Sequence, residues 1–277
     1  MGKLDGKVAL LTGSSPNIVG GIAEGLADEG ARIVSVDLHP AFANGCAEAI
    51  NERGGEAMGL VCDVTDEAQV EAVVEQARQR FGGVDILVNG AVIFNWKGVV
   101  DMPLAEWRHQ IDVILTGNFL VTKHVARLMI EQGRKGSIIN IISTAGHQGE
   151  PWNVGYSTGK GGLLNFTRSV AMELSQHGIR VNSLTPTATD PSEGRERAAR
   201  WGVEWPRPRP YTSTRQGPGG DARSGSPLRT LPSPSHYGKA AAFLASDEAE
   251  MITGLDLRVD AGALAKYWIW NPAEGGS

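Results

Sequence analysis

The sequence of 277 residues is poor in several features that mark particular classes of protein. It holds only two cysteines, Cys46 and Cys62, which are too few for a disulfide framework or a structural zinc site. The net charge is −5, so the chain lacks the basic excess of nucleic-acid-binding proteins. We therefore expect a cytoplasmic protein in a reducing compartment, with no bound metal and no nucleic-acid partner.

Long apolar runs are also missing. No uninterrupted apolar stretch approaches the roughly 20 residues that span a bilayer. Residues 1–13 lack the apolar core of a signal peptide. We expect a soluble protein with no membrane partner, although hydrophobic residues make up 41% of the chain and suffice for a sizeable core.

What the chain does contain is a regular alternation of short apolar runs and longer helical patterns. Near-continuous apolar strands separated by amphipathic helices predict a parallel sheet with helices on both faces. We expect an α/β, Rossmann-like doubly wound fold of about seven strands. The expected strands are 7–13, 31–37, 57–64, 84–91, 136–143, 179–186 and 255–262, and the expected helices are 21–30, 41–53, 66–81, 103–132, 155–177 and 236–249.

Two segments interrupt this alternation. Residues 190–235 are rich in Pro, Gly, Arg and Ser, which fits either a disordered linker or a lid over the substrate. Because a helix and a strand that complete the same sheet follow, we interpret 190–235 as an insertion in a single domain, 1–277. The aromatic tail, 263–277, would be a liability on a monomer, so we expect it to pack on another subunit of a homo-oligomer, a dimer or tetramer.

A glycine-rich turn follows the first expected strand, in the stretch "LLTGSSPNIVGG". Such a turn lets backbone amides at a helix N-terminus face a pyrophosphate. Asp37 closes the second strand, 24 residues after Gly13, where a carboxylate binds the ribose hydroxyls of NAD and repels the 2′-phosphate of NADP. The sequence therefore favours NAD as cofactor.

These residues resemble the short-chain dehydrogenase/reductase family, and the resemblance covers almost the whole chain. Thr12 and Gly13 match the start of the family's TGxxxGxG motif, but Asn17 and Val19 stand where glycines are expected. Asn tolerates left-handed backbone better than most residues, so we expect a reshaped loop that still binds the dinucleotide.

A second motif is also altered. Residues 89–92 resemble the family's NNAG motif and keep Asn89 and Ala91, but Gly90 and Val92 replace Asn and Gly. The resemblance implies dinucleotide contacts at several strand ends and on the helix after residue 154, made by Gly13, Ser15, Asn17, Ile18, Asp37, Asp63, Val64, Asn89, Ala91, Tyr156, Lys160, Thr187 and Thr189.

Tyr156 and Lys160 lie four positions apart, so they share one face of a helix. In the resembled family a YxxxK pair works with a serine about 13 residues earlier, where this chain has Ser143. A free tyrosine has a pKa near 10, and a neighbouring ammonium lowers it. The resemblance implies that Tyr156 is the general acid/base, that Lys160 tunes it and binds ribose, and that Ser143 orients the substrate oxygen.

One departure affects the catalytic group directly. The family completes a tetrad with an asparagine on the preceding helix, but this chain has Ile114 at the matching position. Isoleucine cannot carry a proton relay, so the relay is either slower, routed through solvent, or taken over by Asn118 one turn further along.

Several loop residues are candidates for contact with the substrate. His147 lies between Ser143 and Tyr156, and Trp96 and Trp152 follow the fourth and fifth strands. Together with Trp201 and Trp205 in the insertion, these two tryptophans predict a sizeable apolar or ring-bearing substrate. An ordinary loop histidine and tryptophans used for lid packing are the alternatives.

The sequence predicts an NAD(H)-dependent oxidoreductase that interconverts a secondary alcohol and a ketone. Val19, Gly90 and Ile114 favour one alternative, a catalytically eroded NAD-binding sensor or scaffold. Another alternative keeps the cofactor but acts as an enoyl reductase or an epimerase. The position of Ser143 argues against the reductase, and the lack of a nucleotide-sugar site weakens the epimerase.

Overall fold

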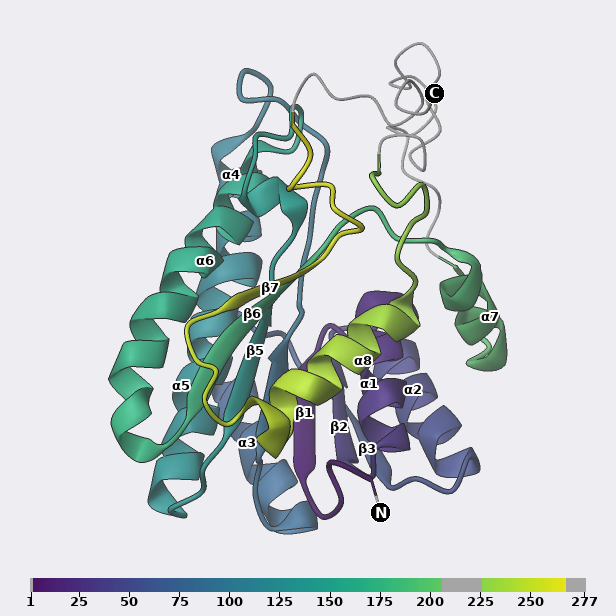
Figure 1. The fold of residues 1–277 in the computed structure, drawn as a ribbon, viewed down its shortest axis with the longest axis vertical. Coiled ribbons are helices and arrows are strands. Elements are labelled where there is room, and N and C mark those ends of the chain that lie inside the picture. The colour runs from purple at the N-terminus through teal and green to yellow at the C-terminus, as the bar shows by residue number, and fades with distance from the viewer. Residues whose placement is uncertain (1, 206–225, 268–277) are drawn as a thin grey trace.

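The computed structural model describes residues 2–205 and 226–267. Its centre is a parallel sheet of seven strands in the order β3-β2-β1-β4-β5-β6-β7 (Figure 1). The strands are β1 (Val8–Thr12), β2 (Arg32–Asp37), β3 (Ala57–Val61), β4 (Ile86–Asn89), β5 (Ser137–Ile141), β6 (Arg180–Pro186) and β7 (Asp256–Val259). The predicted fold class is confirmed.

Helices cover both faces of the sheet. One layer contains α1 (Ile18–Asp28), α2 (Pro40–Glu52) and α8 (Pro234–Ala245), and the other contains α3 (Glu67–Phe81), α4 (Leu104–Ile111), α5 (Gly117–Glu131) and α6 (Val154–Leu174) (Figure 1). The short helix α7 (Ser192–Arg200) lies beside α1 and α2, away from the sheet.

The first strand is apolar from Val8 to Leu11 because both of its faces meet a helix layer. In β1, Val8 and Leu10 pack in the cluster beneath α3 and α5, whereas Ala9 and Leu11 pack in the cluster beneath α1 and α8. All four are completely buried. A strand covered on both faces has no solvent side for polar residues.

The strand order reverses between β1 and β4, where Thr12 pairs with Asn89. Ligands of open α/β sheets bind beyond the carboxyl ends of the strands at such a reversal. The Thr12 hydroxyl accepts hydrogen bonds from the amides of Gly90 (3.2 Å) and Ala91 (3.4 Å), which tie the two strand ends together.

The long helix expected at 103–132 is present but contains a π-helical turn, Asp112–Thr116, between α4 and α5. The continuous stretch Leu104–Glu131 is long and apolar enough to cross a membrane by composition. However, 61% of its most apolar window is buried inside the fold, as in the core helix of a soluble protein.

Within the expected insertion, the helix α7 was not identified from the sequence. Its residues, "SEGRERAAR", provide almost no apolar stripe, so periodicity gives no signal. The rest of the insertion at 206–225 and the end of the tail at 268–277 lie outside the described residues, and the expectations for them stay predictions.

Candidate functional site

The phosphate loop connects β1 to α1. Gly13 has a φ of +73°, and a Cβ there would lie 2.8 Å from the backbone of Ala91, so both conformation and space require glycine. The first amides of a helix have no intrahelical acceptor, and α1 has no acidic residue in its first turn. This donor set fits a dinucleotide pyrophosphate.

The two altered motifs meet at one contact. Val19 is buried, and a Cβ added to Gly90 would lie only 2.4 Å from the Cγ2 atom of Val19. The valine that replaces a loop glycine therefore occupies space left open by the glycine at position 90. The larger side chain at position 19 is thus matched by the missing side chain at position 90.

The carboxylates expected on the adenosine side lie at the ends of β2 and β3. Asp37 is buried, and burial raises the pKa of its carboxyl while its Oδ1 accepts a 2.9 Å hydrogen bond from the His39 amide. Asp63 Oδ1 accepts hydrogen bonds from the amide (2.9 Å) and hydroxyl (2.7 Å) of Thr65. Local hydrogen bonds thus hold both side chains at adjacent strand ends, and Val64 beside Asp63 is buried.

Asn89 directs its side chain into the core. Its Nδ2 donates to Thr122 Oγ1 (2.9 Å) and to Asn140 Oδ1 (3.0 Å), and Asn140 in turn donates to Thr167 (2.9 Å). The asparagine therefore braces β4 and β5 against α5 and α6. This braced strand end leads directly into Gly90 and Ala91.

The predicted catalytic residues lie on consecutive elements. Ser143 follows β5, and its Oγ accepts a 3.2 Å hydrogen bond from the Ala145 amide. Tyr156 is in the first turn of α6, and Lys160 follows one turn later with its Nζ 5.9 Å from the centre of the tyrosine ring. The strand end and the helix start thus present all three at the carboxyl edge of the sheet.

Lys160 is deeply buried for a lysine, with 2% of its surface exposed. Its Nζ donates a 2.6 Å hydrogen bond to the carbonyl of Ile141. Burial lowers the pKa of the ammonium to about 7.

The apolar floor under this group consists of Ile114, Ile142 and Leu163, with Tyr156 packed against it. Ile114 lies in the π-helical turn, and a Cβ at Gly159 would be 2.7 Å from its Cγ2. The space next to Lys160 is therefore shaped for isoleucine.

Asn118, the residue considered as a substitute for the tetrad asparagine, contacts the backbone of Ile114. Its Nδ2 donates a 2.6 Å hydrogen bond to the Ile114 carbonyl. Among the described residues its Oδ1 has no hydrogen-bond partner although it is buried. The geometry leaves the substitute-relay hypothesis to experiment.

An aromatic group that the sequence analysis missed lies beside Tyr156. The Phe94 ring packs edge-to-face on Tyr156 at 5.9 Å and 90°, and lies 5.4 Å from the Trp96 ring. Trp96 and Trp152 have φ values of 58° and 66°, which are strained for bulky residues. Such strain concentrates at binding sites. In the sequence, the aromatic run "VIFNW" after β4 was the signal that could have indicated this group.

The remaining predicted contacts lie nearby but are engaged within the protein. His147 Nε2 lies 3.1 Å from Asp256 Oδ2 and 3.2 Å from Thr185 Oγ1, so the ring faces β6 and β7. Thr189 Oγ1 donates to the Thr187 carbonyl (3.0 Å) and lies 3.0 Å from the Tyr237 hydroxyl. These bonds fix the chain that follows β6.

Two tryptophans of the expected insertion serve packing instead. Trp201 is buried in the core cluster and contacts the positions of Gly20 and Gly45. Trp205 lies against Gly194 on α7. Neither belongs to the aromatic group around Tyr156 formed by Phe94 and Trp96.

Comparison with known proteins gives the family. A model described as short chain dehydrogenase matches residues 7–201. The chain belongs to the short-chain dehydrogenase family. It is 34% identical to a D-threitol dehydrogenase of Mycolicibacterium smegmatis (95% of each chain) and 34% identical to a galactitol 2-dehydrogenase of Agrobacterium fabrum (94% of this chain, 98% of the relative).

A solved structure agrees with this family membership. A gluconate 5-dehydrogenase from Burkholderia cenocepacia, in complex with NADP and tartrate, superposes with a TM-score of 0.81. The two chains are 30% identical over 95% of this chain and 97% of the other. As a short-chain dehydrogenase, this protein is an oxidoreductase of a family that uses a nicotinamide cofactor.

Proposed function

We propose that the protein is an NAD(H)-dependent oxidoreductase that interconverts a secondary alcohol and a ketone. The observation that carries the proposal is the joint placement of Ser143, Tyr156 and Lys160 at the carboxyl edge of β5 and the start of α6. A non-catalytic NAD-binding scaffold has no need of this set.

Each of the three side chains has a separate task. A nicotinamide dinucleotide held beyond the strand ends would supply or take up the hydride when bound. The Ser143 hydroxyl holds the substrate oxygen, and the Tyr156 phenolate takes its proton during oxidation or returns it during reduction. The ammonium of Lys160 lowers the pKa of the phenol, which brings the proton exchange toward neutral pH.

Asp37 supports NAD over NADP because its carboxylate opposes a 2′-phosphate. The related gluconate dehydrogenase holds NADP, so the choice needs a direct test. Removing this charge in Asp37→Ser is expected to raise the ratio of NADP to NAD efficiency (kcat/KM) by about tenfold or more. An unchanged ratio would contradict the assignment of Asp37.

Phe94, Trp96 and Trp152 support a substrate with a sizeable apolar or ring-bearing face, because aromatic rings stack on such faces. The polyol activities of two relatives make acyclic and cyclic polyols the natural comparison set. We expect cyclic alcohols to be turned over with higher kcat/KM than acyclic polyols of the same oxidation state.

The test of the proposal is NADH formation with a panel of steroid, terpenoid, sugar and aromatic alcohols. Tyr156→Phe is the control, because it keeps the ring that packs on Phe94 and removes only the hydroxyl. We expect its kcat to fall by roughly 10²–10⁴ while NADH still binds. A wild-type protein that binds NADH but oxidises no alcohol would favour the eroded sensor.

We further propose a cytoplasmic homo-oligomer. Phe119 on α5 and Met172 on α6 are 47% and 64% exposed, and an interface over these two helices would cover them. Sedimentation at micromolar concentration is expected to give a dimer or tetramer, and a monomer would contradict the proposal.

A further inference from the structure

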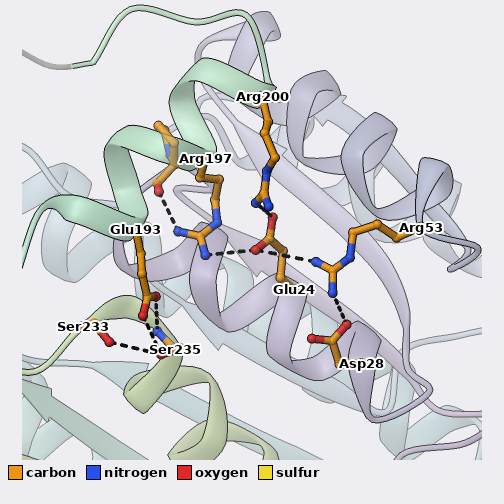
Figure 2. A network of polar contacts seen from close by, with 9 residues as sticks. Glu24, Asp28, Arg53, Glu193, Arg197, Arg200, Ser233 and Ser235 are labelled. Atoms are coloured by element: carbon orange, nitrogen blue, oxygen red, sulfur yellow. Dashed lines mark hydrogen bonds and ion pairs between the residues drawn. The ribbon is translucent and has the colours of Figure 1, made fainter.

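A buried carboxylate joins α7 to the rest of the fold. Glu24 of α1 accepts hydrogen bonds from Arg197 Nη2 (2.9 Å) and Arg200 Nη2 (2.6 Å), both on α7 (Figure 2). Arg53, after α2, adds a weaker ion pair at 3.7 Å and also contacts Asp28. Three cations from two elements thus converge on one acidic group.

Arg197 differs from the other two arginines. Its side chain is 5% exposed, compared with 53% for Arg200 and 44% for Arg53. Its Nη1 also donates a 3.0 Å hydrogen bond to the carbonyl of Pro16, in the phosphate loop. Figure 2 shows this guanidinium directed from α7 toward Glu24. Of these three arginines, only Arg197 has a hydrogen bond to the loop in the part of the chain that the structure describes.

The loop and α7 are also complementary in shape. A Cβ on Gly20 would lie 2.7 Å from the Trp201 ring and 3.0 Å from Arg197 Cδ. A Cβ on Gly194 would lie 3.4 Å from the side-chain oxygen of Asn17, the residue that replaces a motif glycine. The altered loop is therefore in close contact with α7.

We propose that Arg197 is a positioning residue for dinucleotide binding. It fixes the Pro16 peptide, and through it the amides that begin α1, in the conformation that receives a pyrophosphate. Glu24 holds the guanidinium in place and neutralises it, so Arg197 acts through the loop and not as a phosphate ligand. The inference rests on the proposed function only in taking NADH as the dinucleotide.

The experiment is a titration of the full-length protein with NADH, followed by NADH fluorescence. Arg197→Lys keeps a positive charge beside Glu24. One ammonium, however, does not reproduce the two guanidinium nitrogens that bind the Pro16 carbonyl and the Glu24 carboxylate together. We expect NADH affinity to fall about tenfold, as for loss of one charge-assisted hydrogen bond. Arg200→Lys, on the same helix and carboxylate, is the matched control and is expected to stay within about twofold.

A purely structural role predicts a different result. In that case both variants change thermal stability and neither changes the NADH dissociation constant, which would overturn the proposal. The kinetic signature of positioning is a raised KM for the dinucleotide with kcat within about twofold. If Arg197→Lys folds poorly, Glu24→Gln is the second variant, and unchanged NADH affinity in it also contradicts the proposal.

The controls separate this inference from the proposed function. Tyr156→Phe is expected to bind NADH with wild-type affinity but to lack turnover. A wild-type protein that does not bind NADH removes the premise of both proposals. Wild-type binding together with unaltered Arg197→Lys binding overturns the inference alone.

Discussion

The phosphate loop and the floor beneath Lys160 both depart from their family motifs, yet the two departures differ in kind. In the loop, Val19 replaces a glycine, and Gly90 leaves the space that the valine fills. Under Lys160, Ile114 replaces an asparagine, and Gly159 leaves space for the isoleucine. Packing accommodates both changes equally well.

The two departures differ in the functional groups that they leave in place. An exchange of volume between positions 19 and 90 restores a close-packed contact and leaves the backbone amides of the loop in place, although Gly90 stands where the family has an asparagine. The exchange at position 114 leaves apolar side chains below Lys160, whose ammonium finds the Ile141 carbonyl. We therefore expect the loop still to bind the dinucleotide, whereas the Ile114 side chain offers no polar group for a proton relay.

The largest effect is expected from Lys160→Met. It removes the cation on which the proposed proton exchange depends, so kcat should fall by roughly 10²–10⁴. NADH absorbance with the best alcohol of the panel measures it. A loss of kcat below about threefold would show that catalysis does not need the Lys160 ammonium.

The same variant sharpens the comparison through pH. Burial lowers the pKa of Lys160 to about 7 from its ordinary 10.5, so between these values the unfolded chain binds more protons. The free energy of unfolding of the dinucleotide-free protein should therefore gain from Lys160 as pH rises from about 7 to 10.5. The gain is lost as pH falls through about 7. Denaturant unfolding of Lys160→Met should lack this slope.

The exchange in the phosphate loop predicts a coupling of intermediate size. Gly90→Ala overpacks against Val19 and should lower the free energy of unfolding by about 2 kcal/mol. Val19→Ala removes two methyl groups and should cost about 1–2 kcal/mol. The double variant relieves the contact with Val19, although not the 2.9 Å approach of the new Cβ to the Thr12 carbonyl, so its cost should be at least about 1 kcal/mol below the sum. Additive costs in urea unfolding would break the argument for a matched pair.

A smaller effect is expected at Phe94. Replacing it with Leu removes an edge-to-face contact worth about 0.5–1.5 kcal/mol, which corresponds to a two- to tenfold rise in KM for ring-bearing alcohols. Acyclic polyols should be affected less. Equal changes for both substrate classes would assign Phe94 to support of Tyr156 alone.

The smallest effect is expected at Asn118. Within the described part of the chain its amide reaches only the Ile114 carbonyl, so Asn118→Ala should change kcat by about threefold or less. Ile114→Asn, which restores the family residue, should raise kcat instead. Steady-state rates decide the matter, and a loss of more than about tenfold in Asn118→Ala would revive the substitute relay.

The fold could be predicted because its signals are local. Apolar strands covered on both faces and helical periodicity are written in consecutive residues, and Ser143, Tyr156 and Lys160 belong to one strand end and the next helix. The exchange between Val19 and Gly90 was not visible, because its partners lie 71 residues apart and only packing brings them together.

Other parts of the site also depend on tertiary structure. Phe94 follows no spacing rule relative to Tyr156, so its ring contact could not be predicted. The contact of His147 with Asp256 spans 109 residues and joins a loop to the last strand. The polar helix α7 carries no periodic signal, and its value lies in Arg197, which sequence reasoning treated as part of an irregular insertion.

The two cysteines have a practical consequence. Both are buried, and burial raises the pKa of Cys46 to about 12 and that of Cys62 to about 11. Thiols that stay protonated and enclosed react slowly with maleimides. A single cysteine introduced at the exposed position of Arg200 should therefore accept a spectroscopic label in the otherwise unmodified chain, which makes α7 directly observable as dinucleotide is added.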